Sequence, residues 1–151
     1  MPTQYQILPQ RNLVFVRHYG HVTMASAEAS FTDFLEDPQM RPGQNHLADF
    51  SAVTSYEKDY LQFMQFMARI AFDLTGKVAE QFLVLYGPRG PGHELVRANL
   101  RTWDGQQGMT VRTAATEAAA LDILALPERR FSDLVNAESL ARSERPWPME
   151  S

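Results

Sequence analysis

The chain has 151 residues, of which 44% are hydrophobic and 21% charged, and its net charge is −4 at pH 7. This composition is typical of one globular domain, and its acidic balance argues against a general nucleic-acid binder, which needs a basic face. The absence of cysteine excludes disulfides, thiolate nucleophiles and cysteine metal sites. No signal-peptide core is present at the N-terminus, and no apolar run approaches the roughly 20 residues that span a bilayer. We therefore expect a cytoplasmic domain with no membrane span, no nucleic-acid partner and no cofactor.

In the first quarter of the chain, alternating apolar residues predict two strands, Tyr5–Leu8 and Leu13–Tyr19, with turn chemistry between them. The second strand is apolar on both faces and should be covered on both sides. After Gly20 the apolar period changes from 2 to 3.6, which predicts a helix capped by Thr23. Its buried stripe is expected to comprise Met24, Ala27, Phe31, Phe34 and Leu35.

The next elements are a short strand, His46–Phe50, and a second helix. Residues 54–57 match a helix capping box, in which Thr54 would accept from the Glu57 amide and Glu57 would reach back. The predicted helix then runs to about Leu74.

The C-terminal half begins with an unbroken apolar run, Phe82–Tyr86, which is typical of a strand inside a sheet. A Gly- and Pro-rich turn, residues 87–92, ends this strand. Further elements are predicted as a helix over about 93–103 that buries Val96, Leu100 and Trp103, a strand Met109–Thr113, and a helix Glu117–Leu126 capped by Thr116.

The resulting order, β-β-α-β-α-β-α-β-α, predicts an α/β fold with a mostly parallel, five-stranded mixed sheet and helices on both faces. We expect one domain over residues 1–127 and a partly docked or flexible tail over 128–151. Within that tail, Phe131, Leu134 and Val135 should seat one helical turn on the core.

Four segments carry a resemblance to a known family: Leu13–Thr23, Asp37–Gly43, Leu47–Thr54 and Thr116–Ala118. In these segments the chain resembles the STAS-like proteins, specifically the small bacterial group described as SpoIIAA-like or STAS/SEC14-like. The resemblance covers most of residues 4–126. It implies a βα superhelix around a mixed sheet whose first strand is antiparallel, and a role without catalysis.

Anti-sigma-factor antagonists of this kind bind a partner protein and are switched by phosphorylation of a serine in an Asp-Ser-Ser-Gly turn. Here the corresponding stretch reads Tyr56-Glu57-Lys58-Asp59-Tyr60 and lacks those serines. Ser55 is a displaced candidate for phosphorylation, but a phosphate works as a switch only at a defined position. A capping role for Thr54 and Ser55 is the favoured interpretation.

The helix predicted over residues 60–74 has an unusual composition. Eleven of its fifteen residues are apolar, and the polar ones form one narrow stripe. A surface helix needs an apolar arc of only about 100°, so this helix requires a cover beyond the sheet. The cover could be the 37–45 loop, a second copy of the chain or an apolar ligand. The candidate contact residues are Tyr60, Phe63, Met64, Phe66, Met67 and Ile70.

A second candidate site lies where the parallel strands end, because ligands favour that edge of a sheet. Thr54, Ser55, Arg89 and His93 could form an anion or polar site there. Residues 87–92 lack the Gly-Lys-Ser/Thr ending of a phosphate loop, and their two prolines remove amide donors, so a tight turn is the simpler interpretation.

Two further constellations were weighed. His18, His21 and His46 are close in sequence to strand ends, but strand spacing does not bring them to one metal. Asp49 beside Ser51 could act as a base, although such pairs usually make local turns. An enzyme would need Asp49, Ser55 and His93 in one cleft.

Three functions follow. The leading hypothesis is a non-enzymatic module that regulates by contact with a protein partner or by forming a homodimer. The alternative is a carrier or sensor of an apolar small molecule, bound in a pocket next to helix 60–74. The third is a small enzyme at the strand-end edge.

Overall fold

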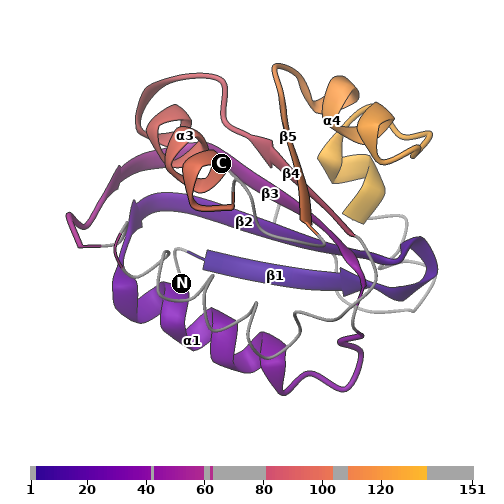
Figure 1. The fold of residues 1–151 in the computed structure, drawn as a ribbon, viewed down its shortest axis with the longest axis horizontal. Coiled ribbons are helices and arrows are strands. Elements are labelled where there is room, and N and C mark those ends of the chain that lie inside the picture. The colour runs from indigo at the N-terminus through magenta and orange to yellow at the C-terminus, as the bar shows by residue number, and fades with distance from the viewer. Residues whose placement is uncertain (1–2, 42, 60–61, 63–80, 104–108, 136–151) are drawn as a thin grey trace.

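Five strands form one mixed sheet in the order β1-β2-β3-β4-β5 (Figure 1). The computed structural model describes residues 3–41, 43–59, 62, 81–103 and 109–135. β1 pairs with β2 in the antiparallel direction, and the three remaining pairs are parallel. The predicted five-stranded, mostly parallel sheet is therefore confirmed. The strands are β1 (Thr3–Leu8), β2 (Leu13–Val22), β3 (Asn45–Tyr56), β4 (Gln81–Tyr86) and β5 (Met109–Ala114).

Helices cover both faces of this sheet. They are α1 (Met24–Leu35), α3 (Gly90–Trp103) and α4 (Glu117–Ile123), and a 3-10 turn, η1 (Pro9–Arg11), joins β1 to β2. α3 packs on the face that carries Phe50 and Leu85, whereas α4 packs on the face that carries Leu47 and Val84. α1 runs along β1 at the sheet edge (Figure 1). The predicted helix 60–74 lies outside the described residues, apart from Gln62.

The alternation of side chains along β3 and β4 divides the interior into two clusters. The α4-side core comprises Leu8, Leu13, Phe15, Leu47, Val84, Ala120, Leu121, Phe131, Leu134 and Val135. The α3-side core comprises Val22, Ala48, Phe50, Val53, Leu83, Leu85, Leu95 and Val96. Because β2 contributes to both clusters, the expectation that this strand is covered on both sides is confirmed.

Two of the three predicted N-caps, Thr23 and Thr116, are confirmed. The Thr23 hydroxyl accepts from the Ser26 amide at 3.1 Å, and the Thr116 hydroxyl accepts from the Ala119 amide at 3.0 Å. Each bond satisfies one of the amides that a helix start leaves without a partner. The threonines therefore fix where α1 and α4 begin.

The buried face of α1 differs from the predicted stripe. Ser26 and Ser30 are the buried residues, whereas the five predicted apolar residues are half-buried. Short serine side chains let the helix lie close to the sheet, and larger rings flank the contact. Phe34 meets the rings of Tyr5 and His46 edge-on, with centroids 5.7 and 5.6 Å apart. α1 lies at the sheet edge, where a helix is covered from fewer sides, and this explains why its predicted apolar stripe is only half-buried.

The capping box at 54–57 is wrong. β3 continues through Thr54 and Ser55 to Tyr56, because β2 also extends to Val22 and pairs with it in parallel. Glu57 does cap a helix start, but a different one: its carboxylate accepts from the Met24 amide of α1 at 2.7 Å. The backbone hydrogen bonds of the long β2–β3 pairing outweigh the hydrogen bonds that a local capping box would make.

α3 begins close to β3. A Cβ at Gly92 would collide with the Phe50 carbonyl oxygen, so only glycine permits this approach. The buried stripe of α3 is centred on Gly92, Leu95 and Asn99. Val96 is buried as predicted, but Leu100 falls at the edge of the stripe and is 41% exposed, which contradicts its predicted burial. The side chain of Trp103 lies outside the described residues.

The start of the C-terminal segment docks on the α4-side core. Phe131, Leu134 and Val135 are 4%, 0% and 1% exposed, which confirms the predicted helical turn. The Phe131 ring lies edge-on to Phe15 and Tyr86, with centroids 5.5 and 5.3 Å away. Residues 136–151 lie outside the described part of the chain.

An ion pair holds the approach to this turn. Arg11 of η1 donates from both guanidinium ends to Glu128, at 3.0 and 2.6 Å. The bidentate bond lowers the pKa of the Glu128 carboxyl below its usual value. Residues 117 places apart in sequence are joined by this contact, so it ties the C-terminal segment to the β1–β2 connection.

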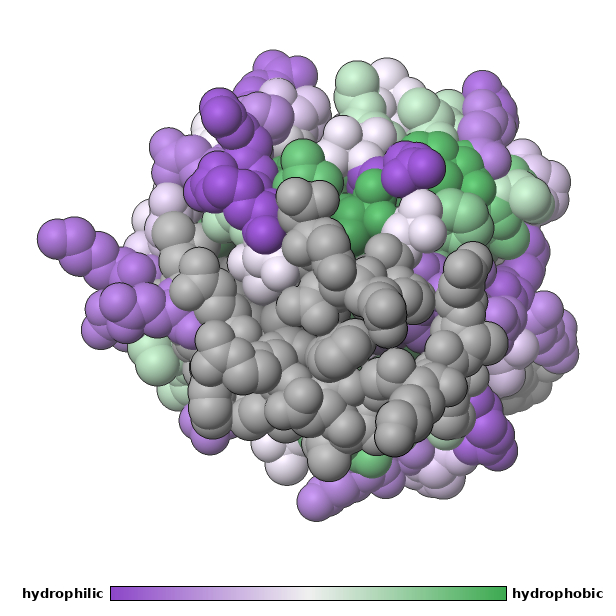
Figure 2. Space-filling view, viewed as in Figure 1, coloured by the Kyte–Doolittle hydropathy of each residue, from purple (hydrophilic) through white to green (hydrophobic). Residues whose placement is uncertain are grey.

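The visible surface in Figure 2 is hydrophilic along one side, and apolar residues gather on the side where Figure 1 shows α4. The half-buried apolar side chains around α4 are Ile123, Leu124 and Leu126. Within the described residues, no helix is both long and apolar enough to cross a membrane.

Substituting Phe131→Ala should lower the free energy of unfolding by about 3–5 kcal/mol, because a buried ring leaves a cavity between Phe15 and Tyr86. Chemical denaturation measures this change. Phe82→Ala is the matched control, since Phe82 is 37% exposed and should give a clearly smaller loss. Equal losses for the two variants would mean that the 131–135 turn is not docked in solution.

Candidate functional site

A row of polar side chains crosses the sheet where the α4-side core ends. Arg17 of β2, Asp49 of β3 and Tyr86 of β4 are direct register partners. They share one face with the start of α4, where Glu117 lies. We call these four residues the strand-end row. The row lies where β4 ends, while β2 and β3 continue beyond it. Ligands of α/β sheets usually bind toward the carboxyl ends of the strands.

Asp49 is the buried charge of the row, with 7% of its surface exposed. Its Oδ1 accepts from the Ser51 amide at 2.9 Å, which confirms the predicted local bond. The strand does not end there, however, since β3 continues to Tyr56. Burial raises the pKa of the Asp49 carboxyl, and the Glu117 charge adds to the rise, while the bonds from Ser51 and the Arg17 charge oppose it.

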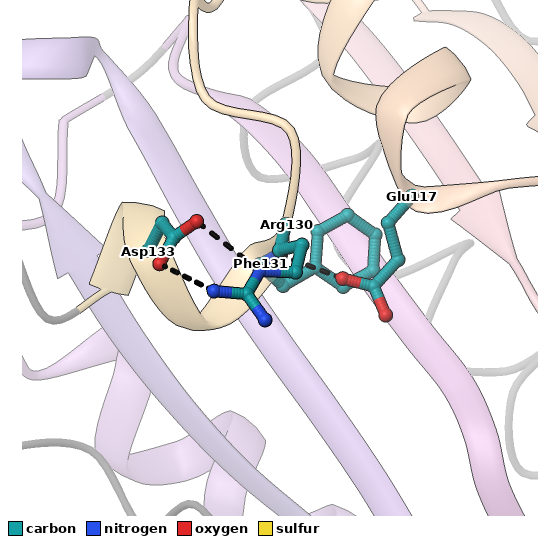
Figure 3. Close-up of polar contacts among 4 residues, drawn as sticks. All are labelled: Glu117, Arg130, Phe131 and Asp133. Carbon is teal, nitrogen blue, oxygen red and sulfur yellow. Dashed lines mark hydrogen bonds and ion pairs between the residues drawn. The ribbon is translucent and has the colours of Figure 1, made fainter.

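Tyr86 and Glu117 complete the row beside the docked C-terminal turn. Burial raises the pKa of the Tyr86 hydroxyl, and the charges of Glu117 and Asp49 raise it further. Figure 3 shows Glu117 directed toward the backbone of Phe131, whose amide donates to Oε1 at 2.8 Å. The neighbouring Arg130 and Asp133 pair at the surface of the same turn (Figure 3). Glu117 therefore anchors the turn at residue 131.

The predicted anion or polar site is divided between two places. Thr54 and Ser55 are exposed on β3, and the Ser55 hydroxyl lies 2.7 Å from Nδ1 of His21. Arg89 is exposed in the turn after β4, and Nδ1 of His93 lies 3.1 Å from the Gly87 carbonyl. The hydrogen bonds of Ser55 and His93 thus go to different neighbours.

The three residues of the enzyme hypothesis also have separate environments. Asp49 points to the α4 side with Leu47, whereas His93 belongs to α3 on the opposite face. Ser55 lies further along β3, beside His21. The histidine within reach of Ser55 is therefore not the one that the sequence suggested.

The other two histidines of interest lie on the α3 side, where His18 is buried and His46 is half-buried. His18 stacks on Phe50 with ring centroids 4.5 Å apart and shares a hydrogen bond of 3.1 Å with the Thr3 hydroxyl. Burial lowers the pKa of His18 to about 4, and that of His46 to about 4 as well. In the part of the chain that the structure describes, no three acidic or histidine side chains gather as a metal-binding group.

The apolar candidates of helix 60–74, namely Tyr60, Phe63, Met64, Phe66, Met67 and Ile70, lie outside the described residues. Sequence reasoning missed the contacts of His21, Glu57 and Glu117. Each of these side chains bonds to a group at least 14 residues away, so no local motif encodes it. In the sequence, the apolar Val22, two residues after Gly20, was the signal that could have predicted the continuation of β2 beyond Gly20.

Comparison with known proteins adds no assignment. No protein-family model matches the chain, and no curated protein matches it significantly.

Replacing Asp49 with asparagine should raise the stability of the protein near neutral pH. The folded-state pKa of Asp49 is raised, so the charged carboxylate destabilises the fold above that pKa, and protonation relieves this at lower pH. Asparagine keeps an oxygen acceptor for the Ser51 amide and carries no charge. The gain in unfolding free energy should shrink as pH falls toward the ordinary aspartate value of 3.8.

Thermal and urea denaturation across pH measure this effect. Asp122→Asn is the matched control, because Asp122 is exposed and pairs with surface Arg129. A gain at Asp122 as large as the gain at Asp49, or a loss at Asp49 at neutral pH, would contradict the burial argument.

Acid should destabilise the protein through His18. The folded-state pKa is about 4 against an ordinary value of 6.5, so the unfolded chain binds the proton first as pH falls between these values. The stabilisation by the neutral ring is present above pH 6.5 and lost toward pH 4, by roughly 3 kcal/mol. A His18→Gln variant should lose less stability than the wild type over that window, as measured by urea denaturation at fixed pH values. An unchanged slope would contradict the prediction.

Proposed function

We propose that the chain is a non-enzymatic, STAS-like binding or regulatory module that acts through protein contact or self-association. The observation that carries the proposal is the composition of residues 60–74, where eleven of fifteen residues are apolar. A stretch that is apolar around most of a helical circumference needs a partner surface in addition to its own sheet.

The fold supports this proposal. STAS-like proteins resemble this chain in having a mixed sheet whose first strand is antiparallel, and β1 of the observed sheet is the antiparallel strand. A SpoIIAA-like βα superhelix is part of the proposal, as is its cytoplasmic location. Fold alone does not assign function, so the polar groups of the described residues have to be considered separately.

The acidic side chains near the strand-end edge favour a role in positioning the backbone over one in acid–base catalysis. Three carboxylates there accept from backbone amides: Asp49 from Ser51 at 2.9 Å, Glu57 from Met24 at 2.7 Å, and Glu117 from Phe131 at 2.8 Å. Carboxylates used in this way position loops and helix starts. The three acids therefore support a structural role.

A second copy of the chain is the preferred partner, because a symmetric dimer covers the same apolar surface on both molecules at once. A stable interface buries about 1,200–2,000 Å² in total. The apolar ligand is the alternative occupant, since Met64 and Met67 provide adaptable side chains suited to varied shapes. A carrier of that kind needs a cavity of about 300–1,000 Å³.

Sedimentation equilibrium of the full chain tests the proposal. The wild type should form a concentration-dependent dimer, and Phe66→Arg should shift it to monomer because a charge enters an apolar contact. Gln65→Arg is the matched control on the polar stripe and should leave the dimer intact. Circular dichroism checks that both variants fold, and Met67→Ser provides a milder second substitution if Phe66→Arg does not.

Native mass spectrometry distinguishes the alternatives. A monomer that carries an apolar molecule from the cell would favour the carrier over the dimer. A wild type that is monomeric at every concentration, binds no such molecule and behaves like Phe66→Arg would overturn the proposal.

A further inference from the structure

We propose that Ser55 and His21 form a nucleophile–base pair that accepts an acyl group from an activated ester. The pair occupies the ends of β2 and β3, and its chemistry is independent of the proposed partner binding. Its two side chains come from positions 34 residues apart that the parallel pairing of these strands brings together.

The geometry meets the first requirement of such a pair. Nδ1 of His21 and Oγ of Ser55 are 2.7 Å apart, within the range expected for a nucleophile and its base. In the tautomer that carries its proton on Nε2, Nδ1 accepts the hydrogen of the Ser55 hydroxyl. The base and the nucleophile are therefore already in contact without any ligand.

The backbone fixes this contact. His21 and Ser55 are register partners, and the register between the two strands shifts immediately before them, between Gly20 and His21. Gly20 has φ of +65°, a conformation that favours glycine. The resulting irregularity redirects the strand ends, as bulges near functional sites commonly do.

Exposure separates this pair from the buried His18 contact, and the type of partner separates it from the His93 contact. Thr3 and His18 also share a hydroxyl–imidazole bond, but they are 5% and 7% exposed, so a substrate cannot reach them. Nδ1 of His93 faces the Gly87 carbonyl, which only accepts, so that nitrogen has to carry a proton and cannot act as a base. His21 and Ser55 are both exposed to solvent.

The acyl transfer balances with an activated ester as the only co-reactant. Oγ of Ser55 attacks the carbonyl carbon while Nδ1 of His21 takes the hydroxyl proton. The tetrahedral intermediate then expels the alcohol or phenol, which leaves with the proton from His21. The products are an ester on Ser55 and a free alcohol or phenol.

The surroundings of the His21–Ser55 pair limit which esters can transfer an acyl group to Ser55. The nearest helix start, that of α1, has its Met24 amide occupied by Glu57 and its Ser26 amide occupied by Thr23. Those two amides are therefore not available to donate hydrogen bonds to an oxyanion. Stabilisation of the oxyanion is usually the largest single contribution to catalysis of acyl transfer. We expect reaction with esters whose leaving group is good, and one acyl group per chain rather than rapid turnover.

The test uses p-nitrophenyl acetate with the full chain. Nitrophenolate release gives the rate, and peptide mass spectrometry should locate one acetyl group on Ser55. Ser55→Ala should abolish that label, and His21→Gln should slow its formation by at least about tenfold through loss of the general base. Added imidazole should restore part of the rate to a His21→Ala variant, because the site is open to solvent.

Ser51→Ala is the matched control. Ser51 is exposed on the same strand, but its neighbour is the Asp49 carboxylate rather than an imidazole, so its removal should leave the labelling rate unchanged. Acetylation that persists in Ser55→Ala, or that is equally fast in His21→Gln with no effect of imidazole, would overturn the proposal. Neither outcome bears on the oligomeric state, so failure here is distinguishable from failure of the binding proposal.

Discussion

The parallel pairing of β2 with β3 positions the polar contacts of His21 with Ser55 and of Glu57 with the start of α1. The two strands pair from Leu13 opposite Asn45 to Val22 opposite Tyr56, and the register shifts twice on the way. This pairing places Arg17 beside Asp49 and His21 beside Ser55. It also brings Glu57 to the start of α1, although 33 residues separate it from Met24. A one-residue slip would turn these side chains to the opposite face, so the register is itself a condition for the site.

The strand-end row marks the level at which the α4-side core stops. Along three neighbouring parallel strands the same two-residue step leads from an apolar to a polar side chain: Phe15 to Arg17, Leu47 to Asp49 and Val84 to Tyr86. Because the change from apolar to polar occurs at register partners, the edge of the α4-side core runs straight across the three strands. Phe131 covers that boundary from the C-terminal segment, in contact with Phe15 on the core side and Tyr86 on the polar side.

Local patterns in the sequence were sufficient for the elements and insufficient for the contacts between them. The unbroken apolar run at 82–86, the threonine caps at 23 and 116, and the apolar spacing of Phe131, Leu134 and Val135 each depend on neighbours within a few residues. Each was predicted correctly. The Thr54–Glu57 pattern is equally local, but there the tertiary pairing of two long strands outweighed it. The row and the His21–Ser55 pair depend on register, which a single sequence does not encode at short range.

Asp49 is buried and Glu117 half-buried, although a charge in such a position opposes folding. Ionised Asp49 opposes folding through desolvation and through the nearby Glu117 charge. Yet the Asp49 carboxylate accepts from the Ser51 amide, where the register of β3 with β2 shifts. Glu117 accepts from the Phe131 amide at the start of the docked turn. A buried amide without a partner would itself be destabilising by about 1–3 kcal/mol. The acids therefore stabilise particular backbone paths at the expense of some overall stability.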